Sequence, residues 1–184
     1  ENAGIGRRAL FSNTTASYNT AVGYNALYNN TTGSGNTAIG QKALDANTTS
    51  SGSTAVGGGA LGASTGDSNT AVGNGAANAT TSGTANVAMG RDSLYFNTTG
   101  SGNVAIGRSS MQGPGSGQST GSNNTAVGRS ALFGNTSGTQ NVAIGKSALD
   151  ANTTGYYNIA VGVDALGANT TGYSNTAVGW NALL

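Results

Sequence analysis

Apolar residues recur along the chain at a fixed distance before a glycine. A triplet of a small residue, an apolar residue and glycine returns every 17 residues, apart from one step of 16 and one of 21. Each repeat, with its triplet, follows the consensus N-T-A-V-G-x-x-A-L-x-x-N-T-T-G-x-x. A period in this range is typical of solenoids, in which each repeat is one coil stacked on its neighbours. The glycines that close the triplets are Gly6, Gly23, Gly40, Gly57, Gly73, Gly90, Gly107, Gly128, Gly145, Gly162 and Gly179.

The short apolar segments predict strands rather than helices. Each spans four or five residues and is bounded by Gly, Asn and Thr, which are strand and turn signals. The chain is therefore predicted to be all-β, a parallel β-solenoid of eleven coils that forms one repeat domain over residues 1–184. At a strand spacing of about 4.8 Å, the rod would be roughly 50 Å long. The 21-residue step adds residues near 112–123, including Pro114, which we expect to protrude as a loop.

Two apolar columns are the candidate core. The residue before each repeat glycine is always apolar. In most coils Leu stands four residues after the glycine. Strand alternation would then turn the Ala before this apolar residue outward, and its small size has two explanations. Another backbone packs against it, or the coil bends tightly there. So thin a core also favours an oligomer. The predicted core residues are Val22, Ile39, Val56, Ile106, Ile144, Leu27, Leu44, Leu61, Leu132 and Leu149.

Asparagine forms two further columns. One opens the strand in nearly every coil, and at strand spacing its amides can hydrogen-bond in a ladder along the rod. The other opens the Asn-Thr-Thr-Gly turn, where Asn bonds its own backbone. These turns also match the glycosylation acceptor pattern, but one repeated turn explains all of them, so we interpret them as structural. The predicted ladder contains Asn19, Asn36, Asn69, Asn103, Asn141 and Asn175.

Composition excludes most chemistry. Charged residues make up 7% of the chain, the net charge is +1, and there is no Cys or His. Thiol and imidazole catalysis, disulfides and zinc sites are thereby excluded, and no strong field attracts nucleic acid. No apolar run is long enough for insertion into a membrane. We predict no enzyme activity, cofactor or metal. The Gly57–Gly62 segment matches a dinucleotide-binding pattern only as a repeat with small substitutions, and Asp150 and Asp164 are expected at different corners.

One charge pattern remains. All seven Lys and Arg residues fall one or two positions after the repeat glycine, in a column expected to face solvent. Simple solubility explains such a column, and the alternative is a surface ridge that touches a glycan or an anionic host surface. The candidate ridge consists of Tyr24, Arg91, Arg108, Arg129, Lys146 and Trp180.

Two repeats carry a family resemblance. Asn103-Val104-Ala105-Ile106-Gly107 and Asn141-Val142-Ala143-Ile144-Gly145 resemble the N-x-V-A-I-G core of YadA-like trimeric autotransporter adhesin heads. The Asn-Thr-Ala-Val-Gly and Asn-Thr-Thr-Gly repeats also resemble those of phage tail fibres. The resemblance implies a left-handed β-roll, three chains side by side, and a location outside the cell, at the cell surface or on a virion. The 17-residue repeat is longer than the adhesin repeat, and residues 1–184 contain no sequence that resembles an adhesin neck, stalk or anchor.

Three function classes follow from these patterns. The first is a structural extracellular fibre or adhesin segment, a stiff rod that displays variable corner residues. The second is a filament subunit that polymerises by stacking end to end. The third is an ice-binding solenoid, against which Val87, Val104, Val142 and Ile159 interrupt the Thr column. The expected partners are copies of the chain and a host surface or glycan. We also expect a processed product or a fibre segment whose ends are covered.

Overall fold

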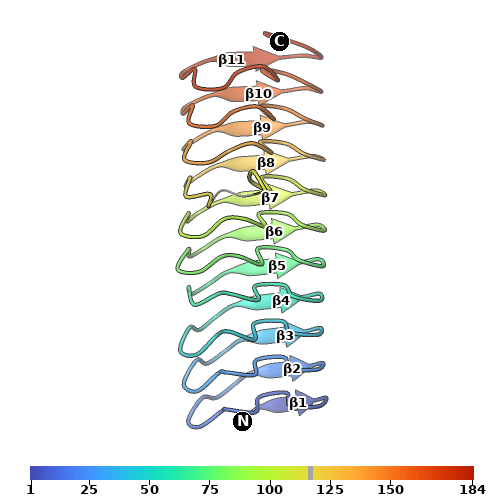
Figure 1. Ribbon diagram of the computed structural model, residues 1–184, viewed down its shortest axis with the longest axis vertical. Coiled ribbons are helices and arrows are strands. Elements are labelled where there is room, and N and C mark those ends of the chain that lie inside the picture. Colours follow the sequence, from blue (N-terminus) through green and yellow to red (C-terminus); the bar gives the residue numbers. More distant parts are fainter. Residues whose placement is uncertain (116–117) are drawn as a thin grey trace.

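The computed structural model describes residues 1–115 and 118–184 and contains one parallel sheet of eleven strands. The strands follow one another in chain order, and each has three residues. Figure 1 shows them stacked along the rod, with one complete turn of chain between each strand and the next. No helix in the described ranges is long and apolar enough to cross a membrane. The strands are β1 Ala3–Ile5, β2 Thr20–Val22, β3 Thr37–Ile39, β4 Thr54–Val56, β5 Thr70–Val72, β6 Val87–Met89, β7 Val104–Ile106, β8 Thr125–Val127, β9 Val142–Ile144, β10 Ile159–Val161 and β11 Thr176–Val178.

The strand register repeats the sequence period. Ala21 pairs with Ala38, and Ala38 pairs with Ala55, so equivalent residues of successive coils lie directly above one another. The two irregular steps do not disturb this register, since Val104 still pairs with Thr125 across the long step. The prediction of a parallel β-solenoid is confirmed.

The repeat glycine forms a corner that no other residue can occupy. Gly23 has φ of 133°, a conformation that L side chains rarely adopt. A Cβ on Gly23 would lie 2.6 Å from the carbonyl oxygen of Gly40 in the next coil. Close stacking and backbone conformation therefore both require glycine, which explains its presence in every coil.

The Leu column and both Ala columns fill the interior. Leu27, Leu61 and Leu149 are fully buried, as predicted for this column. Each Leu follows the corner in a left-handed conformation, for example φ of 50° at Leu27, which strains an ordinary residue. Ala21 and Ala26 are also fully buried, so the coil interior has room for little more than a methyl group beside each Leu.

The Val and Ile residues before the glycine face outward, so this part of the predicted core is wrong. Ile39, Ile106 and Ile144 are 37–40% exposed, and Val22 and Val56 are half-buried. Alternation along the three-residue strand gives the middle residue one direction and its neighbours the other. Because Leu and Asn already occupy the interior, only the smaller Ala can point inward. Ala therefore marks a narrow interior, and neither proposed explanation for an outward Ala applies.

The first Asn column forms a buried ladder. The Asn19 side-chain oxygen accepts the backbone N–H of Asn36 at 2.8 Å, and the Asn19 amide donates to the carbonyl of Gly33 at 2.8 Å. The same pattern recurs at Asn69, Asn103 and Asn141. The Asn36 side-chain oxygen likewise accepts the backbone N–H of Ser53, and its amide donates to the Ser50 carbonyl. Asn175 ends the ladder by donating its backbone N–H and its side-chain amide to the Asn158 oxygen. Each Asn thus joins two coils, because its oxygen accepts from the following coil.

The second Asn column closes the turns. Asn47 donates to the oxygen of Asn30 at 2.8 Å and to the Ser50 carbonyl, and both Asn side chains are fully buried. Beside them Thr31 donates its hydroxyl to the carbonyl of Thr48 in the next coil. Buried amides engaged in this way are closed to glycosylation in the folded rod, which agrees with the structural interpretation of these turns.

The long step leaves the stack continuous on both sides. Gly113 donates to the carbonyl of Phe133 in the following coil, and Ser119 donates to the carbonyl of Phe96 in the preceding coil. Two positions of the predicted loop, 116 and 117, lie outside the described residues. Gly113 and Ser119, which flank the middle of the insertion, are therefore tied to the coils above and below.

Candidate binding surfaces

The outward side chains of the eleven strands form one surface, which we call the sheet face. It has two columns, the residues before the repeat glycine and the residues two positions earlier. Met89, Ile106 and Ile144 are 37–43% exposed, and Ile159 in the second column is 42% exposed. The columns consist almost entirely of Val, Ile, Met and Thr, most of them β-branched and stiff. Charged residues make up 7% of the chain, and none of them lies in a strand.

The sheet face is unusual for a soluble surface. Exposed apolar residues scattered singly are normal, but monomeric proteins rarely expose one continuous apolar surface along their whole length. In Figure 1 the strands lie above one another with little change of direction, so their outward side chains lie in straight columns. The sheet face is therefore a rigid, mostly apolar surface with the length of the rod.

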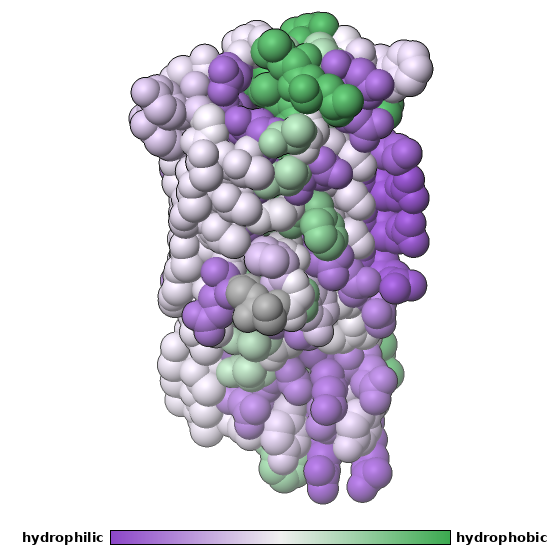
Figure 2. All heavy atoms as spheres, turned by 45° about the horizontal axis from the view of Figure 1, so that its top comes forward, coloured by the Kyte–Doolittle hydropathy of each residue, from purple (hydrophilic) through white to green (hydrophobic). Residues whose placement is uncertain are grey.

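Four cations form a second surface beside the sheet face. Arg91, Arg108, Arg129 and Lys146 directly follow the repeat glycine in four successive coils, and all four are exposed. Their register is set by backbone bonds, because the Arg91 carbonyl accepts from Ser109 and the Arg108 carbonyl accepts from Ser130, at 3.0 and 3.1 Å. These four residues are called the basic column below. Figure 2 shows strongly hydrophilic side chains gathered in a column along one edge of the rod.

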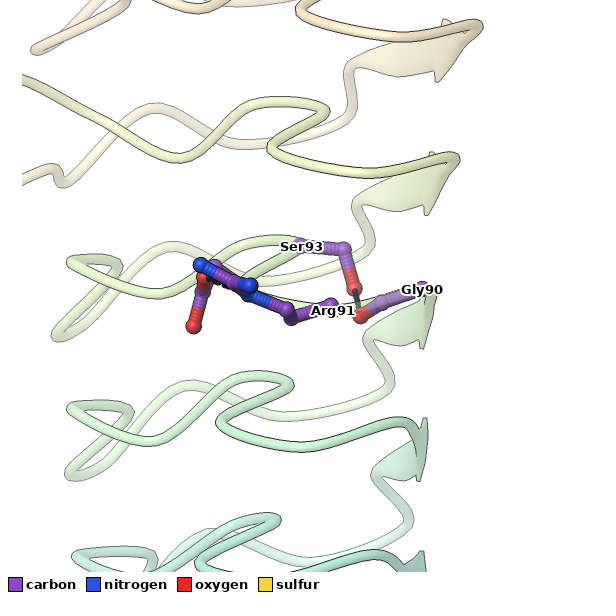
Figure 3. A network of polar contacts seen from close by, with 4 residues as sticks. Gly90, Arg91 and Ser93 are labelled. Carbon is purple, nitrogen blue, oxygen red and sulfur yellow. Dashed lines mark hydrogen bonds and ion pairs between the residues drawn. The ribbon is translucent and has the colours of Figure 1, made fainter.

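Only one member of the basic column has an acidic partner in the described ranges. Arg91 contacts Asp92 at 2.9 Å, and Figure 3 shows the pair on the turn after β6. In the same view the Ser93 hydroxyl donates to the Gly90 carbonyl at 2.9 Å, which satisfies a polar side chain in a column that is Ala in all but two coils. The next three cations are followed by serine instead, at Ser109, Ser130 and Ser147.

Tyr24 and Trp180 share the column position but are not adjacent to the four residues of the basic column. Gln41, Gly58 and Asn74 separate Tyr24 from Arg91, and Val163 separates Trp180 from Lys146. Tyr24 lies instead 5.9 Å from the guanidinium carbon of Arg7 in the first coil. The predicted ridge is thus divided into a basic block and two separate aromatic residues. The sequence already contained this division, which a comparison of successive coils would have shown.

Two carboxylates sit in partly buried positions. Burial raises the pKa of Asp45 above its usual value, although the charge of Lys42 opposes this. Burial also raises the pKa of Asp150, and the charge of Asp164 raises it further. The charge of Asp164 therefore acts on Asp150 from the adjacent coil.

The described part of the chain contains no group of three or more metal-ligating side chains. One hollow of about 430 Å³ is open to solvent and is lined by residues that include Ala79, Phe96 and Gln118, with no titratable side chain among its lining residues. The glycines of the segment that matched a dinucleotide-binding pattern form an ordinary coil corner, with Gly57 at φ of 136°.

Comparisons with protein families, with curated proteins and with solved structures give no match to this chain.

Proposed function

We propose that the chain is a structural rod, a segment of an extracellular fibre or adhesin, and that copies associate side by side through the sheet face. The observation that supports this is the outward direction of the Val and Ile column. Apolar, β-branched residues in every coil stabilise nothing inside the coil, but they would exclude water between two such faces. The resemblance to adhesin heads adds a left-handed winding, an association of three chains and a location at a cell or virion surface to the proposal.

The thin interior supports association as well. Most coils bury one Leu and two Ala-sized side chains, while about 17 residues lose backbone freedom at roughly 1–2 kcal/mol each. Ladder hydrogen bonds offset part of this cost, and burial of the sheet face against a copy would add apolar area in every coil. A rod of this kind gains stability from its neighbours, as small or poorly filled cores commonly do.

The test compares the mass of the protein in solution with that of a variant that carries charge on the sheet face. Sedimentation equilibrium should show the wild type as an oligomer of the 17.8 kDa chain, and the double variant Ile106→Glu, Ile144→Glu as a monomer. Both side chains are exposed in the single chain, so the variant coil should still fold. Two glutamates near the basic column also introduce no repulsion.

The matched control is Thr99→Glu, Thr154→Glu, which adds the same charge at exposed turn positions away from the strands. It should remain oligomeric. A wild-type protein that stays monomeric at high concentration, or a control that dissociates as fully as the sheet-face variant, would refute association through this face.

A further inference from the structure

We propose that the basic column binds a linear acidic polysaccharide that carries one carboxylate or sulfate on each sugar. The column is formed by Arg91, Arg108, Arg129 and Lys146 in four successive coils. This inference does not depend on side-by-side association, because it concerns a different surface and a different partner.

The clustering of charge is the first observation. The whole chain has seven basic residues and a net charge of +1, yet four of the seven are in adjacent coils at one column position. Backbone bonds from Ser109 to Arg91, from Ser130 to Arg108 and from Ser147 to Arg129 hold these positions in line. Like charges held one coil apart, at about 4.8 Å, repel one another. The rod thus carries a local repulsion that an anionic ligand would relieve.

The charges are also free to act on a ligand. All four side chains are exposed, and the only ion pair in the described ranges is the one between Arg91 and Asp92. Adjacent coils are about 4.8 Å apart, less than the screening length of about 8 Å at physiological salt. The fields of neighbouring cations therefore add, and the column acts as a line of charge roughly 14 Å long.

The spacing selects the class of anion. A pyranose with its linkage is about as long as one coil is high, so a polysaccharide with one acidic group per sugar can place successive charges beside successive cations. Duplex DNA carries a phosphate every 3.4 Å or so along each strand and winds those phosphates around its axis, so a straight column meets few of them.

The test uses oligogalacturonate of defined length, its fully methyl-esterified form, and duplex DNA of equal charge, measured by isothermal titration calorimetry at low and physiological salt. The basic-column variant is Arg108→Gln, Arg129→Gln, Lys146→Gln. Glutamine already occupies this column at Gln41, so the coils accept it. The matched control is Arg7→Gln, Arg8→Gln, Lys42→Gln, which removes the same charge from the first and third coils.

Oligogalacturonate should bind the wild type and the control with similar affinity, and this affinity should fall as salt rises. Its affinity for the basic-column variant should be at least about tenfold lower. The esterified oligomer should not bind. Equal losses in both variants would show that net charge alone is responsible and would overturn the proposal. So would an absence of binding at low salt, or tighter binding of duplex DNA, which would assign the column to nucleic acid instead.

Discussion

At the scale of single residues, the backbone conformation of the corners explains most of the repeat. The glycine is required because the next coil passes within contact distance of its missing Cβ. The residue two positions later and the Leu four positions later also have positive φ, as at Asn25 and Leu27, without being glycine. Leu accepts this strain because its side chain then points into the interior, where burial offsets the cost.

Two glycine substitutions should have opposite effects on stability. Gly107→Ala places a Cβ 2.6 Å from the Gly128 carbonyl oxygen at φ of 123°, and should lower the free energy of unfolding by about 3 kcal/mol or more. Gly4 occupies the inward Ala column in the first coil, has no positive φ, and would meet its neighbours at ordinary contact distances of 3.6–3.9 Å. Gly4→Ala should therefore raise stability by about 0.4–1 kcal/mol.

Urea titration of the two variants checks this prediction. If Gly107→Ala unfolds at the wild-type urea concentration, the close stacking at the corner is not what requires glycine. If Gly4→Ala is destabilising, the first coil does not have the Ala-sized space that its neighbours imply.

At the scale of elements, the Asn ladder contributes more than the three-residue strands suggest. Asn141 accepts from the backbone N–H and the side-chain amide of Asn158, and donates to the Gly155 carbonyl at 2.8 Å. The neighbouring ladder residues Asn124 and Asn158 are fully buried, so each lost hydrogen bond leaves a polar group that water cannot reach. The ladder therefore fixes the height of each coil from inside.

Removal of one ladder side chain should be costly. Asn141→Ala leaves the Asn158 N–H and the Gly155 carbonyl without these partners, and should lower the free energy of unfolding by roughly 2–4 kcal/mol. Asn74→Ala, at an exposed corner position, is the matched control and should change stability by less than about 0.5 kcal/mol. Thermal unfolding of both variants provides the measurement, and equal effects would mean that the ladder is not a stabilising element.

At the scale of the whole molecule, the two partly buried carboxylates make stability depend on pH. Asp45 and Asp150 have pKa values raised in the folded rod, mainly by burial. The folded state therefore binds these protons more tightly than the unfolded chain does. Stability contributed by the protonated forms is present at low pH and is lost as pH rises from the unfolded pKa of 3.8 through the raised folded values.

The expected result is a melting temperature that falls as pH rises from about 4 to neutrality, by an amount that Asp45→Asn, Asp150→Asn reduces. Asn occupies the equivalent position at Asn78, so the substitution suits the turn. At neutral pH the double variant should melt above the wild type, and below pH 3.8 the two should converge. A double variant that melts below the wild type at neutral pH would mean that the carboxylates stabilise the rod when ionised.

The period, the parallel stacking, the buried Leu column and the Asn ladder could all be predicted from the sequence. Each of these depends on local constraints that recur in every coil, such as the glycine corner or the amide that bonds its own neighbours. A repeat also restates the same constraint eleven times, so one exception such as Ser53 does not obscure it.

Only the tertiary structure decided which side of each strand faces inward. Alternation separates Ala21 from Thr20 and Val22, but it does not say which set is inside, and hydrophobicity alone favours Val22. The deciding quantity is the width of the coil interior, which Leu27 and Asn19 already fill, so that only a methyl group fits beside them. The sequence by itself determined the coil and its period. The narrow space left inside the folded coil determined that Val and Ile point outward.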